Sequence, residues 1–179
     1  MGIDPQMGQQ TRPVRALIAL GGNLPWQDIA PELLLPKVFD ALDGDEIRVL
    51  ARSSLWRTPA WPDPSAPAYV NAAAAIETIM NAEALLQRLH AIEWEFGRVR
   101  GEGRNQSRTL DLDIVDFGGQ QIDMPDLTLP HPRAASRAFV LLPLQEVAPD
   151  WCDPVSRQEI GALIAALPDS DVSACVRIG

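Results

Sequence analysis

Two aspartates separated by one residue, Asp111 and Asp113, are the side chains in this sequence best suited to holding a metal ion. Residues 110–117 are mostly apolar and predict a strand, so both carboxylates should project from one face of it. Hard oxygen ligands of this kind suit Mg²⁺, which takes one or two protein carboxylates and leaves other positions to phosphate oxygens. The spacing alone also fits an exposed strand face with solvated aspartates. The residues around the pair are therefore needed to distinguish a metal site from a solvated surface.

Arginine is concentrated just before this pair, although the formal net charge of the chain is −9. The arginines in question are Arg98, Arg100, Arg104 and Arg108. Guanidinium groups bind phosphate oxygens through paired hydrogen bonds, so this segment is suited to close over a polyphosphate. A solvated basic loop that pairs with acidic surface is the alternative. The single lysine, Lys37, lies outside any glycine-rich loop, which excludes a P-loop and the strand lysine of a protein kinase.

Two further groups of residues could bind a ligand. His131 lies between two prolines and is followed by Arg137 and Phe139, so it is a credible donor to a polyphosphate, although a lone histidine is more often structural. Tyr69 and Asn71 share a face of a predicted strand. An aromatic ring beside an amide suits a flat heterocycle with several hydrogen-bonding edges, although packing alone also explains such a pair.

Hydrophobic periodicity and turn residues predict the elements that position these side chains. We expect strands at 14–20, 46–55, 69–79 and 110–117, helices at 25–42 and 81–96, and a proline-rich loop at 58–67. Further on we expect a hairpin to 120–122, a short helix at 134–137 followed by strand up to 146, a helix at 157–167 and a strand at 172–178. This order matches a ferredoxin-like β-α-β-β-α-β core, an α+β fold with an antiparallel sheet and helices on one face, plus C-terminal additions.

The composition limits the class of protein. With 179 residues, 46% hydrophobic and 22% charged, we expect one domain over 14–179 after a disordered leader or tag at 1–13. Two histidines without an HExxH pattern, and two cysteines without CxxC spacing, predict neither a zinc site nor a disulfide framework. No apolar run is long enough for a membrane span, and the acidic balance disfavours nucleic acid. We therefore expect a cytoplasmic monomer without nucleic-acid or membrane partners.

Taken in order, several segments resemble the 6-hydroxymethyl-7,8-dihydropterin pyrophosphokinase family of the folate pathway. The resemblance runs from about Val14 to Trp151. It is carried by GGNL at 21–24, SSLWRTPAW at 53–61, YVNAA at 69–73, IEWEFGRVR at 92–100, SRTLDLDI at 107–114, LPHPRAASRAFVLLPL at 129–144 and EVAP at 146–149. Seven motifs in the same order are far more specific than the aspartate pair alone.

The resemblance implies a ferredoxin-like fold and a diphosphotransferase that moves pyrophosphate from ATP to the pterin hydroxymethyl group, with two Mg²⁺ ions and AMP as the second product. Asp111 and Asp113 match the family's metal ligands, and Arg98 and Arg108 match its catalytic arginines at the phosphates. The implied ATP-binding residues are Glu93, Arg100, Arg108, Ile114, Thr128, His131 and Arg137. The implied pterin-binding residues are Thr58, Pro59, Tyr69, Asn71 and Phe139, with Tyr69 and Phe139 on the two faces of the ring.

The sequence also departs from the family. Residues 104–108 read RNQSR, without the tryptophan and proline of the family's RWGPR-like loop, and Asp126 stands at a position that is often basic. We expect residues 101–107 to be mobile until ATP and pterin are both bound. A catalytically weak paralogue that still binds pterin or nucleotide is the alternative function. An RNA-binding ferredoxin-like module is a second alternative, which the acidic charge and the single tyrosine disfavour.

Overall fold

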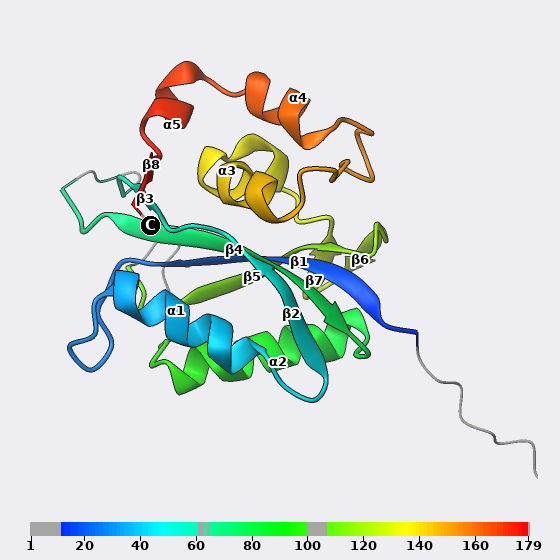
Figure 1. Ribbon diagram of the computed structural model, residues 1–179, viewed down its shortest axis with the longest axis horizontal. Helices are drawn as coiled ribbons and strands as arrows, with labels where there is room; N and C mark the ends of the chain where they lie inside the picture. Colours follow the sequence, from blue (N-terminus) through cyan, green and yellow to red (C-terminus); the bar gives the residue numbers. More distant parts are fainter. Residues whose placement is uncertain (1–11, 61–62, 64, 100–106, 179) are drawn as a thin grey trace, which may run out of the picture.

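The computed structural model describes residues 12–60, 63, 65–99 and 107–178. Most of the expected leader, Arg100 and most of the expected mobile loop therefore lie outside the described residues. The chain folds around an antiparallel sheet with the order β5-β1-β4-β3-β8, in which β2 also pairs with β4 (Figure 1). The strands are β1 (Val14–Gly22), β2 (Ile47–Arg52), β3 (Trp56–Thr58), β4 (Tyr69–Thr78), β5 (Asp111–Phe117) and β8 (Val176–Arg177).

Two helices, α1 (Pro31–Leu42) and α2 (Ala82–Glu95), cover one face of the sheet. The buried side chains of both helices form one core with Ile18, Ala74 and Leu112 of the strands. The β1-α1-β2-β4-α2-β5 order and the antiparallel pairing confirm the expected ferredoxin-like core. The expected 46–55 strand is shorter in the structure, because β2 ends at Arg52, and a separate short strand, β3, follows it and leads into the proline-rich loop.

The helix boundaries follow local chemistry. The side-chain oxygen of Asn81 accepts a hydrogen bond from the Ala84 amide at 2.8 Å, which confirms it as the N-cap of α2. The first helix begins at Pro31, later than the expected residue 25. The reason is that Trp26 and Ile29 exchange backbone hydrogen bonds of 3.0 and 2.8 Å in a tight turn, and a proline is well accommodated in the first helical turn.

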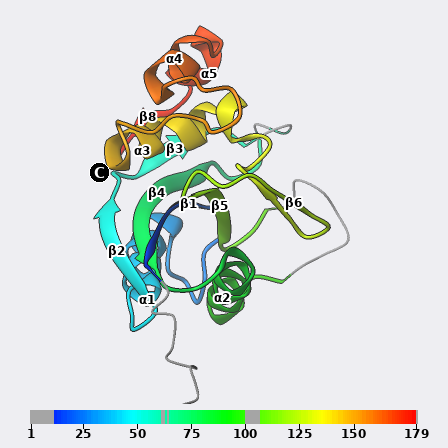
Figure 2. The ribbon, with the colours of Figure 1, turned by 90° about the vertical axis from the view of Figure 1, so that its right-hand side faces the viewer.

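The opposite face of the sheet is covered by α3 (Ala138–Val147), with α4 (Ile160–Ala165) packed beyond it (Figure 2). The expected strand leading up to residue 146 is therefore wrong. Buried positions in this segment, Val140, Leu141, Leu144 and Val147, recur at helical spacing. The helix is apolar on most sides because it lies between the sheet and α4, which hides its periodicity.

The remaining elements also correct the expected C-terminal half. The hairpin consists of β6 (Ile122–Met124) and β7 (Leu127–Leu129), which pair with each other rather than with β5. A 3-10 turn at Ala134–Ser136 replaces the short helix at 134–137, α4 is shorter than 157–167, and α5 (Asp169–Ser173) takes up the start of the expected last strand. Among the described residues, no helix is long and apolar enough to cross a bilayer.

Candidate active site

Three strands bring the predicted metal side and the predicted pterin side next to each other. Gly21 of β1 lies opposite Asn71 of β4 on one side and opposite Asp111 of β5 on the other. We call these three residues the Asn71–Gly21–Asp111 row. Neighbouring strands are about 5 Å apart, so the row spans about 10 Å. Asp113 lies on the same face, opposite Ala19, as the alternation along the strand predicts.

Glycine is required at two positions where this row meets the next turn. A Cβ atom at Gly21 would lie 2.9 Å from Oδ1 of Asn71, so a side chain there would displace the amide. A Cβ atom at Gly22 would lie 2.3 Å from the Thr109 carbonyl oxygen. The absence of both side chains lets β1 pass close to Asn71 and to the segment that enters β5.

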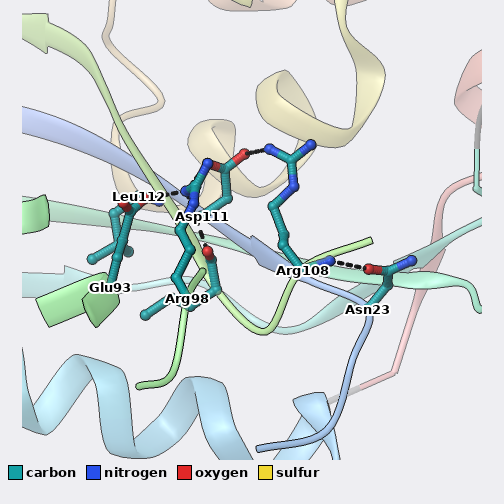
Figure 3. A network of polar contacts seen from close by, with 7 residues as sticks. Asn23, Glu93, Arg98, Arg108, Asp111 and Leu112 are labelled. Atoms are coloured by element: carbon teal, nitrogen blue, oxygen red, sulfur yellow. Dashed lines mark hydrogen bonds and ion pairs between the residues drawn. The ribbon is translucent and has the colours of Figure 1, made fainter. Parts of the chain in front are cut away.

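The charged part of the site is a network around Asp111 (Figure 3). Oδ2 of Asp111 accepts a 2.6 Å hydrogen bond from Nη1 of Arg108, while Oδ1 pairs with Nη1 of Arg98. Arg98 also pairs with Glu93 and donates to the Leu110 carbonyl at 3.2 Å. Glu93 is only 2% exposed, and its Oε1 accepts the Leu112 amide at 2.8 Å. The helix α2 is thus fastened to β5 through the buried Glu93 carboxylate and through Arg98, while Arg108 holds the other oxygen of Asp111.

Asn23 holds the segment that carries Arg108 in place. Its side-chain oxygen accepts the Arg108 amide at 2.9 Å, and its own amide donates to the Arg108 carbonyl at 2.9 Å (Figure 3). Its side-chain nitrogen donates at 3.0 Å to both the Pro67 carbonyl and the Ser107 hydroxyl. This residue is 3% exposed and was not among the predicted site residues. A polar residue at the end of a buried strand, directly after two glycines, is the signal that could have identified it.

The second aspartate faces a different pair of basic residues. Burial, followed by the negative charge of Asp111, raises the pKa of the Asp113 carboxyl, while His131, Arg98 and Arg137 act against that rise. Burial lowers the pKa of His131, and the charge of Asp113 partly opposes this. His131 is held near the end of β5 by a 2.9 Å hydrogen bond from its amide to the Val115 carbonyl. The structure therefore places His131 and Arg137 close enough to Asp113 for their charges to act on it.

Three of the predicted pterin residues, Thr58, Tyr69 and Asn71, lie together at the other end of the row. Asn71 donates from Nδ2 to the Thr58 hydroxyl at 2.9 Å, and both side chains are buried. Tyr69 of β4 lies directly opposite Thr58 of β3, and Thr58 is followed by the exposed Pro59. Phe139 lies in the first turn of α3, partly exposed, with the Arg137 guanidinium 5.5 Å from its ring centre.

The remaining nucleotide-side predictions have different placements. Glu93 belongs to the charged network, and Thr128 is exposed on β7. The Ile114 side chain is in the core against α1 and α2, so only its backbone can face a ligand. Arg100 lies outside the described residues. A cavity of about 430 Å³ borders the network on its α2 side and is lined by His90, Glu93, Trp94, Arg98 and Val99.

The acidic side chains of the site can supply two of the ligands of a Mg²⁺ ion, but not a complete set. In the part of the chain that the structure describes, no cluster of three or more His, Cys, Asp or Glu side chains could enclose a metal ion. Two carboxylates on one strand face are nevertheless the usual protein share for Mg²⁺ bound with a nucleotide, because phosphates and water supply the other ligands. The raised pKa of Asp113 also indicates a place where added positive charge is favourable.

Comparisons with known proteins point to one family. A family model for 7,8-dihydro-6-hydroxymethylpterin-pyrophosphokinase (HPPK) matches residues 17–149. The 2-amino-4-hydroxy-6-hydroxymethyldihydropteridine pyrophosphokinase of Synechocystis sp. is 39% identical over 156 residues, which is 83% of this chain and 74% of the relative. The protein of the same name from Pseudomonas aeruginosa is 41% identical over 155 residues, 86% of this chain and 92% of the relative.

A solved structure supports the fold. Wild-type HPPK-DHPS of Plasmodium falciparum matches with a TM-score of 0.66 at 13% identity, over 86% of this chain and 41% of that one. The chain thus spans about two fifths of that protein, and at this identity the likeness concerns the fold alone. The family model and the two bacterial relatives carry the assignment. The chain belongs to the 7,8-dihydro-6-hydroxymethylpterin-pyrophosphokinase family.

Proposed function

We propose that this chain transfers the pyrophosphoryl group of ATP to 6-hydroxymethyl-7,8-dihydropterin at the Asn71–Gly21–Asp111 row. As a member of its family the chain is a pyrophosphokinase of folate biosynthesis with ATP as co-substrate. The observation that supports the site most strongly is this row, which puts a buried amide and a carboxylate on opposite sides of one glycine. In the reaction, the hydroxymethyl oxygen bonds to the β-phosphorus and loses its proton to solvent. The bond from the β-phosphorus to the oxygen that bridges to the α-phosphorus breaks, and AMP leaves with that oxygen.

The proposal assigns Asp111 and Asp113 to two Mg²⁺ ions that bind together with the ATP phosphates. Bound there, Mg²⁺ would neutralise the charge that develops on the transferring phosphates. The two carboxylates share a strand face. The raised pKa of Asp113 means that its ionised form would be stabilised by a positive charge nearby. The protein therefore supplies a small anionic surface, and the substrate supplies the remaining ligands.

The arginines are assigned to the phosphates. Arg98 and Arg108 now hold the two oxygens of Asp111, and a phosphate group offers the same paired acceptors. Exchange of Asp111 for phosphate oxygens would leave the carboxylate available for metal. His131, Arg137, Thr128, Arg100, Glu93 and the backbone of Ile114 complete the proposed nucleotide side.

The pterin side is assigned to residues that are already in place. Asn71 and Thr58 are hydrogen-bonded to each other and present an amide and a hydroxyl to one edge of the ring. Tyr69 and Phe139 would lie against its two faces, with Pro59 at the rim. Positioning of the hydroxymethyl group and neutralisation of phosphate charge are the main sources of catalysis in this scheme.

Several broader features belong to the same proposal. Residues 14–179 form one pyrophosphokinase domain that works as a cytoplasmic monomer, with ATP and the pterin as its partners and neither nucleic acid nor membrane. The alternative of a catalytically weak paralogue is not favoured by relatives of about 40% identity that carry the enzyme's name.

A direct test measures AMP release with Mg²⁺ and ATP, in the presence and absence of hydroxymethyl-dihydropterin. We expect AMP and pterin diphosphate in equal amounts, only when all three components are present. AMP release at the same rate with and without the pterin would contradict the pterin as the acceptor. Binding of both ligands without AMP release would favour the weak paralogue.

A further inference from the structure

A very short strand carries one of the proposed pterin ligands. Thr58 is the last residue of β3, which has three residues and pairs with β4 through Trp56, Arg57 and Thr58. So short a strand has few ladder hydrogen bonds of its own, and its neighbour on the outer side, β8, has only two residues. The position of Thr58 therefore depends on contacts outside the ladder.

One carboxylate in α3 supplies two of these contacts. Oε2 of Glu146 accepts the Ser54 amide at 2.8 Å, and Oε1 accepts the indole Nε1–H of Trp56 at 3.0 Å. An ionised carboxylate can accept both bonds at once, which a neutral amide or a hydroxyl could not do equally well. Glu146 thus joins α3 to the chain on both sides of Leu55, just before Thr58.

The C-terminal strand supports the same joint. Arg177 of β8 donates to the Ser54 hydroxyl from Nε at 2.8 Å and from Nη2 at 2.6 Å. Its Nε also lies 3.7 Å from Oε1 of Glu146, close enough for an ion pair. The Ile178 amide donates to the Leu55 carbonyl at 2.8 Å. A positive charge therefore lies beside the carboxylate, where it opposes the cost of partial burial.

The other end of α3 carries Phe139. Phe139 and Glu146 lie about two helical turns apart, near the two ends of the same helix. Glu146 therefore connects the helix that presents Phe139 to the strand that presents Thr58. These two elements form opposite sides of the proposed pterin pocket.

We propose that Glu146 is a positioning residue that sets the distance between α3 and β3 and thereby the affinity for the pterin. This inference rests on the proposed function, because it takes Thr58 and Phe139 to be pterin ligands. Glu146 itself does not touch the substrate. Its effect should be selective, since the charged network at Arg98, Arg108 and Asp111 makes none of the contacts described for Glu146.

The test compares Glu146→Ala with a matched control, Glu77→Ala. Glu77 lies on β4 and pairs with Arg48 at 2.7 Å, and its side chain is 34% exposed against 27% for Glu146. Both variants lose a half-exposed glutamate that pairs with an arginine. Binding of the pterin is followed by its fluorescence, and binding of Mg²⁺ with a non-hydrolysable ATP analogue by calorimetry. Thermal unfolding establishes the folded fraction of each variant.

We expect Glu146→Ala to raise the Kd and KM for the pterin about tenfold, the scale of one lost hydrogen bond to a charged group. The Kd for the ATP analogue and kcat should change by less than about twofold, and Glu77→Ala should change neither ligand. Equal losses for both ligands, or a Glu146→Ala variant that behaves like the control, would overturn the proposal. Pterin affinity is measured without turnover, so absent AMP release in the wild-type chain would count against the proposed function alone.

A milder variant covers the case in which Glu146→Ala does not fold. Trp56→Phe keeps an aromatic ring but removes the indole N–H that Glu146 accepts. It should weaken pterin binding in the same selective way, and the double variant with Glu146→Gln should be no weaker than the worse single variant. Additive losses would show that the two residues act independently, which overturns the proposed joint.

Discussion

The two ends of the Asn71–Gly21–Asp111 row are held by different kinds of contact. At the Asp111 end, one carboxylate is shared between two arginines, and one of these also pairs with a buried glutamate. At the Asn71 end, a neutral amide donates to a buried hydroxyl on a strand that is tied down at several points. The first end is built from charges, and the second from neutral groups in fixed positions.

This difference has a consequence for binding. The ion pairs at the charged end have the same chemistry as an arginine–phosphate contact, so a polyphosphate can replace Asp111 as the arginines' partner. In the proposed function, the neutral end would present its hydrogen-bonding groups to the pterin in an orientation already fixed by Thr58, and this would lower the ordering cost of binding. We therefore expect substitutions at the charged end to affect mainly transfer or stability, and those at the neutral end to affect mainly pterin affinity.

The largest effect is expected from removing a proposed metal ligand. Asp111→Ala or Asp113→Ala should lower kcat by about 10³-fold, because the developing phosphate charge loses a counter-ion worth several kcal/mol. Pterin binding should persist in both variants. AMP release with saturating substrates measures the loss, and circular dichroism checks the fold. Substantial transfer by either folded variant would break the assignment of this end to metal.

Arg98→Ala should have the next largest effect, on stability as well as activity. It removes the Arg98 guanidinium from the buried Glu93 carboxylate, at a cost of about 3 kcal/mol in the free energy of unfolding. Arg108→Ala should cost less than about 1 kcal/mol, because the side chain of its partner Asp111 is 27% exposed, against 3% for Glu93. Urea unfolding compares the two. Equal stability losses would mean that the Glu93–Arg98 pair is no more structural than the outer pair.

At the neutral end, Asn71→Ala should weaken pterin binding by about 1–3 kcal/mol, which is roughly a 5- to 150-fold rise in Kd. Binding of the ATP analogue should remain within about twofold. Asn81→Ala is the matched control, since it removes the N-cap of α2 and should cost about 1 kcal/mol of stability without changing pterin binding. If Asn71→Ala weakened both ligands alike, the contrast between the two ends would be lost.

The smallest expected effect is on thermal stability, and it comes from replacing Asp113. Because the folded-state pKa of Asp113 is raised by burial and by Asp111, its ionised form destabilises the fold at neutral pH. That penalty starts to shrink as the pH falls to the raised pKa and is gone below the ordinary pKa of the unfolded chain's aspartate. With a chelator present to remove metal ions, Asp113→Asn should therefore raise the midpoint of thermal unfolding at neutral pH. The increase in the midpoint should be smaller in mild acid. Asp111→Asn should lower the midpoint, since Asp111 holds two arginines. A destabilised Asp113→Asn variant would contradict this account.

Much of the charged end could be predicted from local spacing. Alternation along residues 110–117 placed Asp111 and Asp113 on one face, and the structure shows both opposite β1 on that face. Arginine density before the pair pointed to an anion site, and Arg98 and Arg108 do reach Asp111. The helix over 138–147 was missed because a helix buried on most sides has few polar positions to reveal its period.

What the sequence determined by itself is the direction in which each side chain leaves its own strand or helix, since that depends only on the local repeat. The tertiary structure decided which of these side chains meet. Asn71 and Asp111 flank Gly21 only because β1 pairs with both β4 and β5. Asn23 reaches Pro67 and Arg108, and Glu146 reaches Trp56, across long stretches of chain. Such contacts depend on how whole elements pack to bury their apolar faces, and no local spacing encodes that packing.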